Sequence, residues 1–165
     1  MHSAPDSSRN VTTKELATQA FTDLHNAIFS HESDVSAGNV DAIHDMRVAV
    51  RRMRVALSNF ASILNQDGRK LTYHKLSDLA DKLGAVRDID VFIAALEKRK
   101  SKLTAKQQTH ISNFIRRLRA RRRRQQQQLA TYLQGADYHL LKHDFLLLIQ
   151  IPSASINDGA QEMHG

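Results

Sequence analysis

The chain has 165 residues, enough for one ordinary domain, and its 24 Lys and Arg against 17 Asp and Glu give a net charge of +7 with histidine neutral. A basic balance of this size favours an anionic partner. The absence of cysteine excludes disulfides, thiolate nucleophiles and cysteine-ligated metal sites, while the low content of Gly, Pro and aromatic residues favours helices over a β-sandwich or barrel.

Apolar residues recur at helical spacing over five segments of the chain. The polar segments 1–12 and 152–165 are expected to be disordered tails, and the first lacks the apolar stretch of a signal peptide. Short loops between long amphipathic helices are typical of an antiparallel bundle, so we expect an all-α fold with one helical bundle over 13–151. The approximate helix ranges are 14–36, 40–64, 71–100, 105–133 and 136–151.

Helix boundaries are marked by residues with specific backbone roles. Gly38 is expected to stop the first helix and Asn39 to cap the second. The dipeptide Asp67-Gly68 is typical of a turn and is expected to end the second helix. Thr104 is expected to cap the fourth helix. No run approaches the roughly 18 apolar residues of a membrane span, so the sequence predicts a cytoplasmic protein without a membrane partner.

The positive charge is concentrated in one segment. Residues 98–124 contain twelve Lys and Arg and no acid, so this segment carries +12 and the rest of the chain sums to −5. A solvated helix face usually mixes both signs, whereas a one-signed cluster attracts polyanions. The segment therefore favours binding of an anion.

A ladder of basic residues on the second predicted helix gives the sharpest signal. At about 100° per residue, His44, Arg47, Arg51 and Arg54 share one strip that borders the apolar strip. Guanidinium groups at this spacing repel each other unless an acidic helix or an anion compensates them. Their steps of about 4.5–6 Å suit an extended phosphate-bearing anion, because the guanidinium fork binds phosphate oxygens in pairs. His44 could donate to the same anion when protonated, or bond a carboxylate as a structural histidine.

Basic residues on the third and fourth predicted helices extend this hypothesis. Lys75 and Lys82 border the apolar strip of the third helix, where they could lengthen the groove or serve as ordinary surface lysines. On the fourth helix Arg122 falls within the apolar strip, with Arg119 beside it, and a charge there needs a partner or an anion-filled groove. We interpret three further residues as structural ion-pair residues: Arg87, Asp88 and Asp90.

Two of these segments resemble the signatures of a known family, the CHAD domain or conserved histidine α-helical domain. The first is His44-Asp45-Met46-Arg47-Val48-Ala49-Val50-Arg51-Arg52-Met53-Arg54, and the second is Leu83-Gly84-Ala85-Val86-Arg87-Asp88-Ile89-Asp90-Val91. The stretch 121–148 resembles a third, weaker pattern that carries an arginine at Arg122. The similarity covers roughly residues 14–150.

The resemblance implies a helical module that binds inorganic polyphosphate and is located at cytoplasmic polyphosphate granules. The implied binding residues are those that line the predicted groove: His44, Arg47, Arg51, Arg54, Lys75, Lys82, Arg119 and Arg122. A full CHAD domain is similar to two four-helix halves, each with its own His-and-Arg helix. This chain shows one such helix and so resembles the first half plus the start of the second. Such a chain is either a truncated CHAD domain or a half that completes itself by dimerising. A half domain leaves apolar surface uncovered, from which we expect self-association.

The sequence predicts a binding module and not an enzyme. It contains neither a Gly-x-Ser-x-Gly nucleophile turn nor a Gly-x4-Gly-Lys phosphate loop, and we expect no catalytic residues, cofactor or metal site. Nucleic-acid binding is the alternative function, since any basic strip gains from counterion release. A third reading is a protein-interaction domain whose arginines meet the acids of a partner.

Overall fold

The computed structural model describes residues 12–150, and both predicted tails lie outside these residues apart from Thr12. The all-α fold is confirmed, since the described residues form six α-helices, one short 3-10 segment and no strand. None of these helices is both long and apolar enough to cross a membrane. The elements are α1 (Thr13–Phe29), α2 (Glu32–Ser36), α3 (Val40–Asn59), η1 (Ala61–Ile63), α4 (Gln66–Lys100), α5 (Ala105–Leu133) and α6 (Ala136–Gln150).

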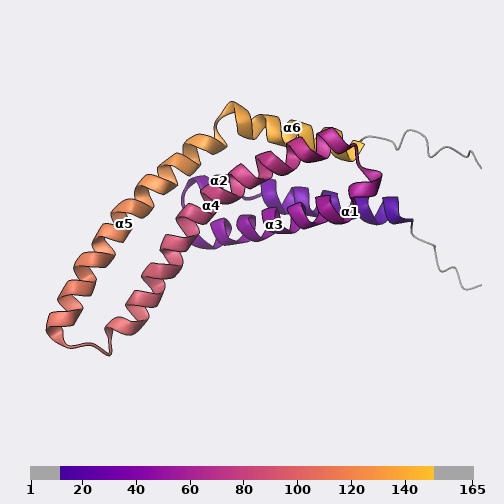
Figure 1. The fold of residues 1–165 in the computed structure, drawn as a ribbon. Helices are drawn as coiled ribbons and strands as arrows, with labels where there is room; N and C mark the ends of the chain where they lie inside the picture. The colour runs from indigo at the N-terminus through magenta and orange to yellow at the C-terminus, as the bar shows by residue number, and fades with distance from the viewer. Residues whose placement is uncertain (1–11, 151–165) are drawn as a thin grey trace, which may run out of the picture.

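The helices form a bundle from which a two-helix hairpin extends (Figure 1). Helices α1, α3 and α6 and the first part of α4 lie side by side, while the rest of α4 and the first part of α5 run away from them. We call this hairpin, residues 89–120, the arm. The long helix α4 belongs to both parts, and its ribbon curves where it leaves the bundle.

The bundle core is built on the apolar strip of α3. Ile43, Met46, Val50, Met53 and Leu57 are fully buried, as the helical periodicity predicts. They pack in one cluster with buried residues of α4, among which are Leu76, Leu79, Leu83 and Val86. Burial of each large apolar side chain contributes about 1.5–3 kcal/mol, so this seam fixes α3 against α4.

The predicted helix boundaries at Gly38, Asn39 and Thr104 are confirmed. Gly38 has a φ of +85°, a backbone conformation that strains residues with a Cβ atom. The Asn39 side chain accepts hydrogen bonds from the N–H groups of Asp41 and Ala42, each 3.0 Å long. At the start of α5, Gln107 Oε1 accepts a 3.1 Å hydrogen bond from the N–H of Thr104.

Two predicted boundaries are wrong. The first predicted helix is interrupted around His31, which separates α1 from α2. The dipeptide Asp67-Gly68 lies in the first turn of α4 and forms no terminating turn, because Asn65 Oδ1 accepts the Gly68 N–H at 2.9 Å and so caps the helix two residues earlier.

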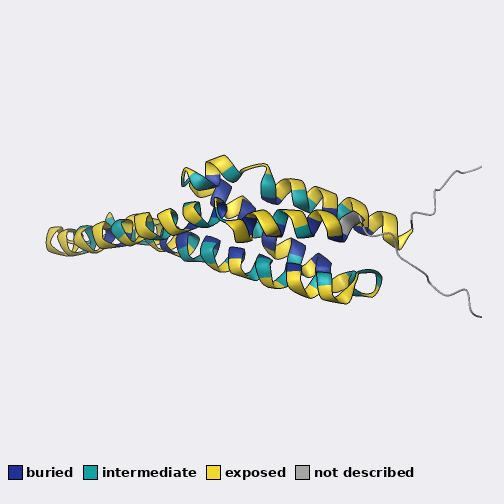
Figure 2. Cartoon of the chain, turned by 90° about the horizontal axis from the view of Figure 1, so that it is seen from above, coloured by how far each residue is buried: buried dark blue, intermediate teal, exposed yellow. Residues whose placement is uncertain are grey.

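The arm is thinner than the bundle and more exposed, as Figure 2 shows. Its buried seam includes Ile89, Ile115 and Leu118, none of which belongs to the main core cluster. Phe92 and Phe114 contact each other edge-on with ring centroids 6.0 Å apart, yet both remain exposed. Two helices can bury only one stripe of each partner, which leaves the other faces of the arm open to solvent.

Candidate functional site

Helices α3 and α4 enclose a groove of about 540 Å³. Arg47, Arg51 and Arg54 line the wall formed by α3, in agreement with the ladder predicted from the sequence. Small residues on α4 leave the space that the arginine side chains border. The remaining lining residues are Val48, Ala80, Asp81, Gly84, Ala85 and Asp88.

Arg54 is held in place by an aromatic ring of α4. Its Nη2 atom donates a 3.0 Å hydrogen bond to the Tyr73 hydroxyl, and its Cζ atom lies 4.8 Å from the centre of the Tyr73 ring. A guanidinium over an aromatic face is stabilised by the ring quadrupole. Tyr73 therefore fixes the position of one end of the ladder.

Arg47 and Arg51 are exposed, and no other described residue forms an ion pair or a side-chain hydrogen bond with them. They lie four residues apart on α3, a spacing at which like charges repel. Asp81 and Asp88 stand on the α4 wall, but neither approaches an arginine closely enough for an ion pair within residues 12–150. The groove thus carries three guanidinium groups against two carboxylates, and two of the guanidinium groups, those of Arg47 and Arg51, have no side-chain partner among the described residues.

His44 lies on the same helix, one turn before Arg47, and is exposed. It is not one of the residues that line the groove. Helical geometry places it as a continuation of the arginine strip beyond the end of the groove.

The structure does not bring Lys75 and Lys82 into this groove. Lys75 Nζ bonds Asp144 Oδ2 of α6 at 2.5 Å, and this hydrogen bond is the main reason that the pKa of Asp144 is lowered. Lys82 Nζ lies 4.9 Å from the centre of the Tyr132 ring, in a separate hollow between α4 and α5. Three carboxylates line that hollow, which makes it unsuited to a polyanion. The prediction that these lysines extend the groove is therefore wrong.

Arg119 and Arg122 also lie elsewhere, because each faces a carboxylate of α4. Arg119 Nη2 bonds Glu97 Oε1 on the arm at 2.5 Å. Arg122 donates from Nε to Asp90 Oδ1 at 3.0 Å and from Nη2 to Asp90 Oδ2 at 3.3 Å. The positive charge of Arg122, which helical periodicity places in the apolar strip of α5, is thus neutralised by the carboxylate of Asp90.

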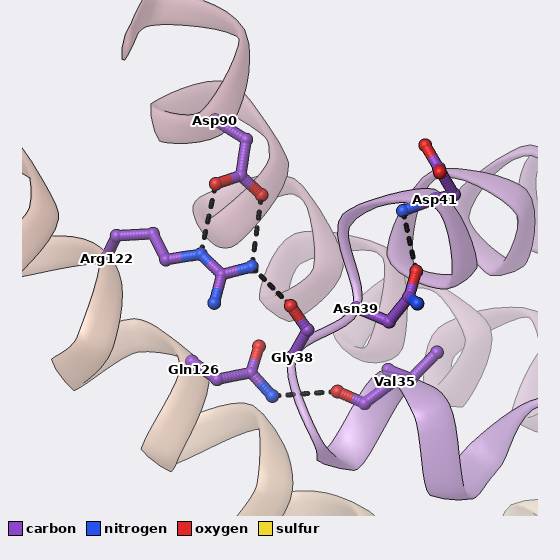
Figure 3. A network of polar contacts seen from close by, with 7 residues as sticks. All are labelled: Val35, Gly38, Asn39, Asp41, Asp90, Arg122 and Gln126. Atoms are coloured by element: carbon purple, nitrogen blue, oxygen red, sulfur yellow. Dashed lines mark hydrogen bonds and ion pairs between the residues drawn. The ribbon is translucent and has the colours of Figure 1, made fainter. Parts of the chain in front are cut away.

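Arg122 also joins α5 to the turn between α2 and α3 (Figure 3). Its Nη2 atom donates a 2.8 Å hydrogen bond to the carbonyl oxygen of Gly38, and Gln126 donates a 2.7 Å bond to the carbonyl oxygen of Val35. Together with the ion pair to Asp90, these bonds fix the end of α2 and the turn before α3 against α4 and α5. Arg122 therefore has a structural role between helices and does not line the groove.

Of the three residues interpreted as structural ion-pair residues, only Asp90 has such a partner in the described part of the chain, and that partner is Arg122. Asp88 lines the groove, and Arg87 is half-buried without an ion pair to any described residue. The sequence marked Asp90 as an ion-pair residue without identifying its partner, which comes from another helix.

Three residues that shape the groove were missed: Tyr73, Asp81 and Ala80. The signal for the α4 wall was the pair of small residues Ala80 and Gly84, four apart on one helix face. Tyr73 gave no periodic signal, because its role depends on packing against another helix. Across the described residues, no three His, Asp or Glu side chains come close enough to share a metal ion.

Comparison with known proteins identifies the family. A search of curated proteins finds no match to this chain. The sequence model of the CHAD domain matches residues 19–163, a range that contains both motif segments and every residue of the groove. The match covers well over half of the chain, and the protein therefore belongs to the CHAD domain family.

Proposed function

We propose that the groove between α3 and α4 binds inorganic polyphosphate and that the chain acts as a binding module without catalysis. The family is known for binding polyphosphate. The observation that carries the proposal for this chain is that Arg47 and Arg51 reach one groove while having no ion-pair partner among the described residues. An anion that bridges them would remove their mutual repulsion.

The geometry favours an extended anion over a single small ion. Arg47 and Arg51 are separated by about 6 Å along the helix axis, and Arg51 and Arg54 by about 4.5 Å. A chain with a phosphate at every step can meet all three groups, and each guanidinium can donate two parallel hydrogen bonds. A polyphosphate chain carries only non-bridging oxygens on its phosphorus atoms, and no larger group that would need space beside Val48 or Ala85 on the walls.

The test is polyphosphate affinity of charge variants on α3. Arg47→Gln and Arg51→Gln should each weaken binding about tenfold or more, since a charge-assisted hydrogen-bonded contact contributes about 1.5–3 kcal/mol. Arg51→Lys should restore only part of the affinity, because an ammonium cannot reproduce the fork. Arg52→Gln is the matched control, as Arg52 is exposed on the same helix and does not line the groove. Equal losses in the Arg51 and Arg52 variants would refute a groove and indicate only diffuse attraction.

We also propose that the chain self-associates and accompanies polyphosphate granules in the cytoplasm. Leu140 and Leu147, seven residues apart on one face of α6, are nearly half exposed, and exposed apolar side chains on a common face favour a protein contact. Light scattering of the parent and of a Leu140→Gln/Leu147→Gln variant tests this, with a shift towards monomer expected in the variant. A fluorescent fusion that stays diffuse in cells with visible granules would exclude the granule association.

A further inference from the structure

The outward side of α5 carries a second basic surface that is separate from the groove. Its basic residues are exposed, and none forms an ion pair with a described residue. Arg119 and Arg122, in contrast, form ion pairs with Glu97 and Asp90. In Figure 1, α5 forms an edge of the molecule, so this side is open. The residues are Lys106, Arg116, Arg117, Arg121, Arg123 and Arg124.

Packing does not require this charge. The buried contacts of α5 are made by Ile115, Leu118, Leu129 and Leu133. Arg117, Arg121 and Arg124 follow each other at four and three residues, a spacing at which like charges destabilise a helix. An anion on this side of α5 would convert that repulsion into attraction.

The arginines of this surface form two rows with an uncharged ridge between them. Ile115 and Leu118 point into the seam with α4, and at about 100° per residue Asn113 and Ala120 lie on the opposite side, where they form the ridge. The two rows are centred about 120° apart around the helix axis, which at an outer radius of about 5–6 Å separates them by roughly 9–10 Å. One row contains Arg116 and Arg123, and the other contains Arg117, Arg121 and Arg124.

This spacing distinguishes between polyanions. A single thin chain cannot lie on both rows at once. The major groove of B-form DNA is about 12 Å wide, admits an α-helix and has a phosphate strand on each side. The major groove of an RNA duplex is too narrow and deep for side chains to enter. We propose that the outward face of α5 binds duplex DNA in the major groove, with each arginine row on the phosphates of one strand.

The two-row arrangement suits contacts with DNA phosphates better than contacts with base edges. The ridge that would face the bases offers one amide, at Asn113, and the apolar side chain of Ala120, whereas the arginines stand on its flanks. Phosphate contacts position a protein on DNA and carry no sequence information. Binding is therefore only weakly dependent on sequence, steeply dependent on salt, and stronger for a duplex than for a single strand of the same length.

The test is fluorescence anisotropy with a mixed-sequence duplex of about 20 base pairs at several salt concentrations. The triple variant Arg117→Gln/Arg121→Gln/Arg124→Gln removes one row and should lose at least tenfold in DNA affinity. The slope of log K against log salt should fall by about 2.7, which is 0.9 for each of three lost phosphate contacts. Polyphosphate affinity should stay within about twofold. Circular dichroism checks that the helices persist, as expected for exposed side chains.

Two controls separate this proposal from others. Lys98→Gln/Arg99→Gln/Lys100→Gln removes the same three charges at the tip of the arm, and equal loss there would overturn directed docking. Arg47→Gln/Arg51→Gln should keep DNA binding, and loss of DNA in that variant would move the site to the groove. The proposal also fails if the parent does not bind DNA, if single strands bind as well as duplexes, or if the α5 variant loses polyphosphate instead. Failure of polyphosphate binding in the groove would leave the DNA result unaffected.

Discussion

The Nε atom of Arg47 lies 3.9 Å from the position that a Cβ atom would occupy on Gly84. Apart from the two chain neighbours of Gly84 and the backbone of its own helix, no other atom of the described residues approaches that position within 4 Å, so the missing side chain leaves open space in front of the guanidinium. The width of the groove at Arg47 is thus set by a glycine within a helix. Glycine in a helix interior costs about 1 kcal/mol relative to alanine.

Substitutions at Gly84 should separate stability from binding. A Cβ at 3.9 Å makes ordinary van der Waals contact, so Gly84→Ala should raise the free energy of unfolding by about 0.5–1 kcal/mol and leave polyphosphate affinity almost unchanged. Gly84→Met adds a longer chain that fills the groove and should weaken binding without removing any charge. Denaturant titration and polyphosphate titration measure the two effects. A methionine variant that binds as tightly as the parent would place the site elsewhere.

Removing a carboxylate from the α4 wall should strengthen polyphosphate binding. Asp81 lines the groove opposite the arginines, and its charge opposes an incoming polyanion. Asp81→Asn should raise affinity about two- to fivefold at low salt, the effect of an exposed charge pair, and the gain should shrink as salt increases. Asp45→Asn is the control, because Asp45 is exposed on α3 and does not line the groove. Identical gains in both variants would show that only net charge matters.

Arg122 should matter for stability and not for polyphosphate binding. Its side chain and that of Asp90 are only 17% and 11% exposed, so truncating either one leaves a poorly hydrated charge. We expect Arg122→Met and Asp90→Asn each to cost about 2–4 kcal/mol of unfolding free energy, with the double variant losing less than the sum of the two. Folded samples should keep their polyphosphate affinity. A tenfold weaker affinity in folded Arg122→Met would return this residue to the binding site.

The ion pair between Lys75 and Asp144 should give stability a specific pH dependence. The hydrogen bond from Lys75 lowers the pKa of Asp144 below its ordinary value of 3.8 in the folded chain. The carboxylate therefore stabilises the fold above pH 3.8, and this contribution disappears as the pH falls through the lowered pKa. Lys75→Met should destabilise by about 1 kcal/mol at pH 7 and by less at a pH below 3.8, such as pH 2.5. Denaturation curves of the parent and of Lys75→Met at both pH values check this. An equal loss of unfolding free energy at the two pH values would contradict the prediction.

The sequence predicted best what local chemistry determines. The bounds of α5 follow from Thr104 before it and Gly135 after it, and the structure confirms them as Ala105–Leu133. The α3 core strip was predicted from the 3.6-residue period alone. Arg47, Arg51 and Arg54 were predicted to share a groove because one helix carries all three, so no knowledge of tertiary packing was needed.

What the sequence could not supply are relationships between helices. Helical periodicity placed Arg122 among apolar residues, where a charge needs a partner. That partner, Asp90, lies 32 residues away on α4. Lys75 and Lys82 bordered the apolar strip as predicted, yet α6 and α5 provided the neighbours Asp144 and Tyr132. The failure at Asp67-Gly68 had a local cause, since a strong turn signal was outweighed by the cap at Asn65.

Helix α4 runs unbroken over 35 residues, a length of about 52 Å, and carries both a wall of the groove and one side of the arm. The number of residues in α4 therefore determines the direction in which the arm points, because each residue rotates the helix by about 100°. One residue inserted between Asp90 and Glu97 would turn the tip by about 100° and detach Glu97 from Arg119, whereas seven residues would turn it by only about 20° while lengthening it by about 10 Å. Relatives of this chain with longer or shorter arms should thus differ by multiples of seven, with matching changes in α5.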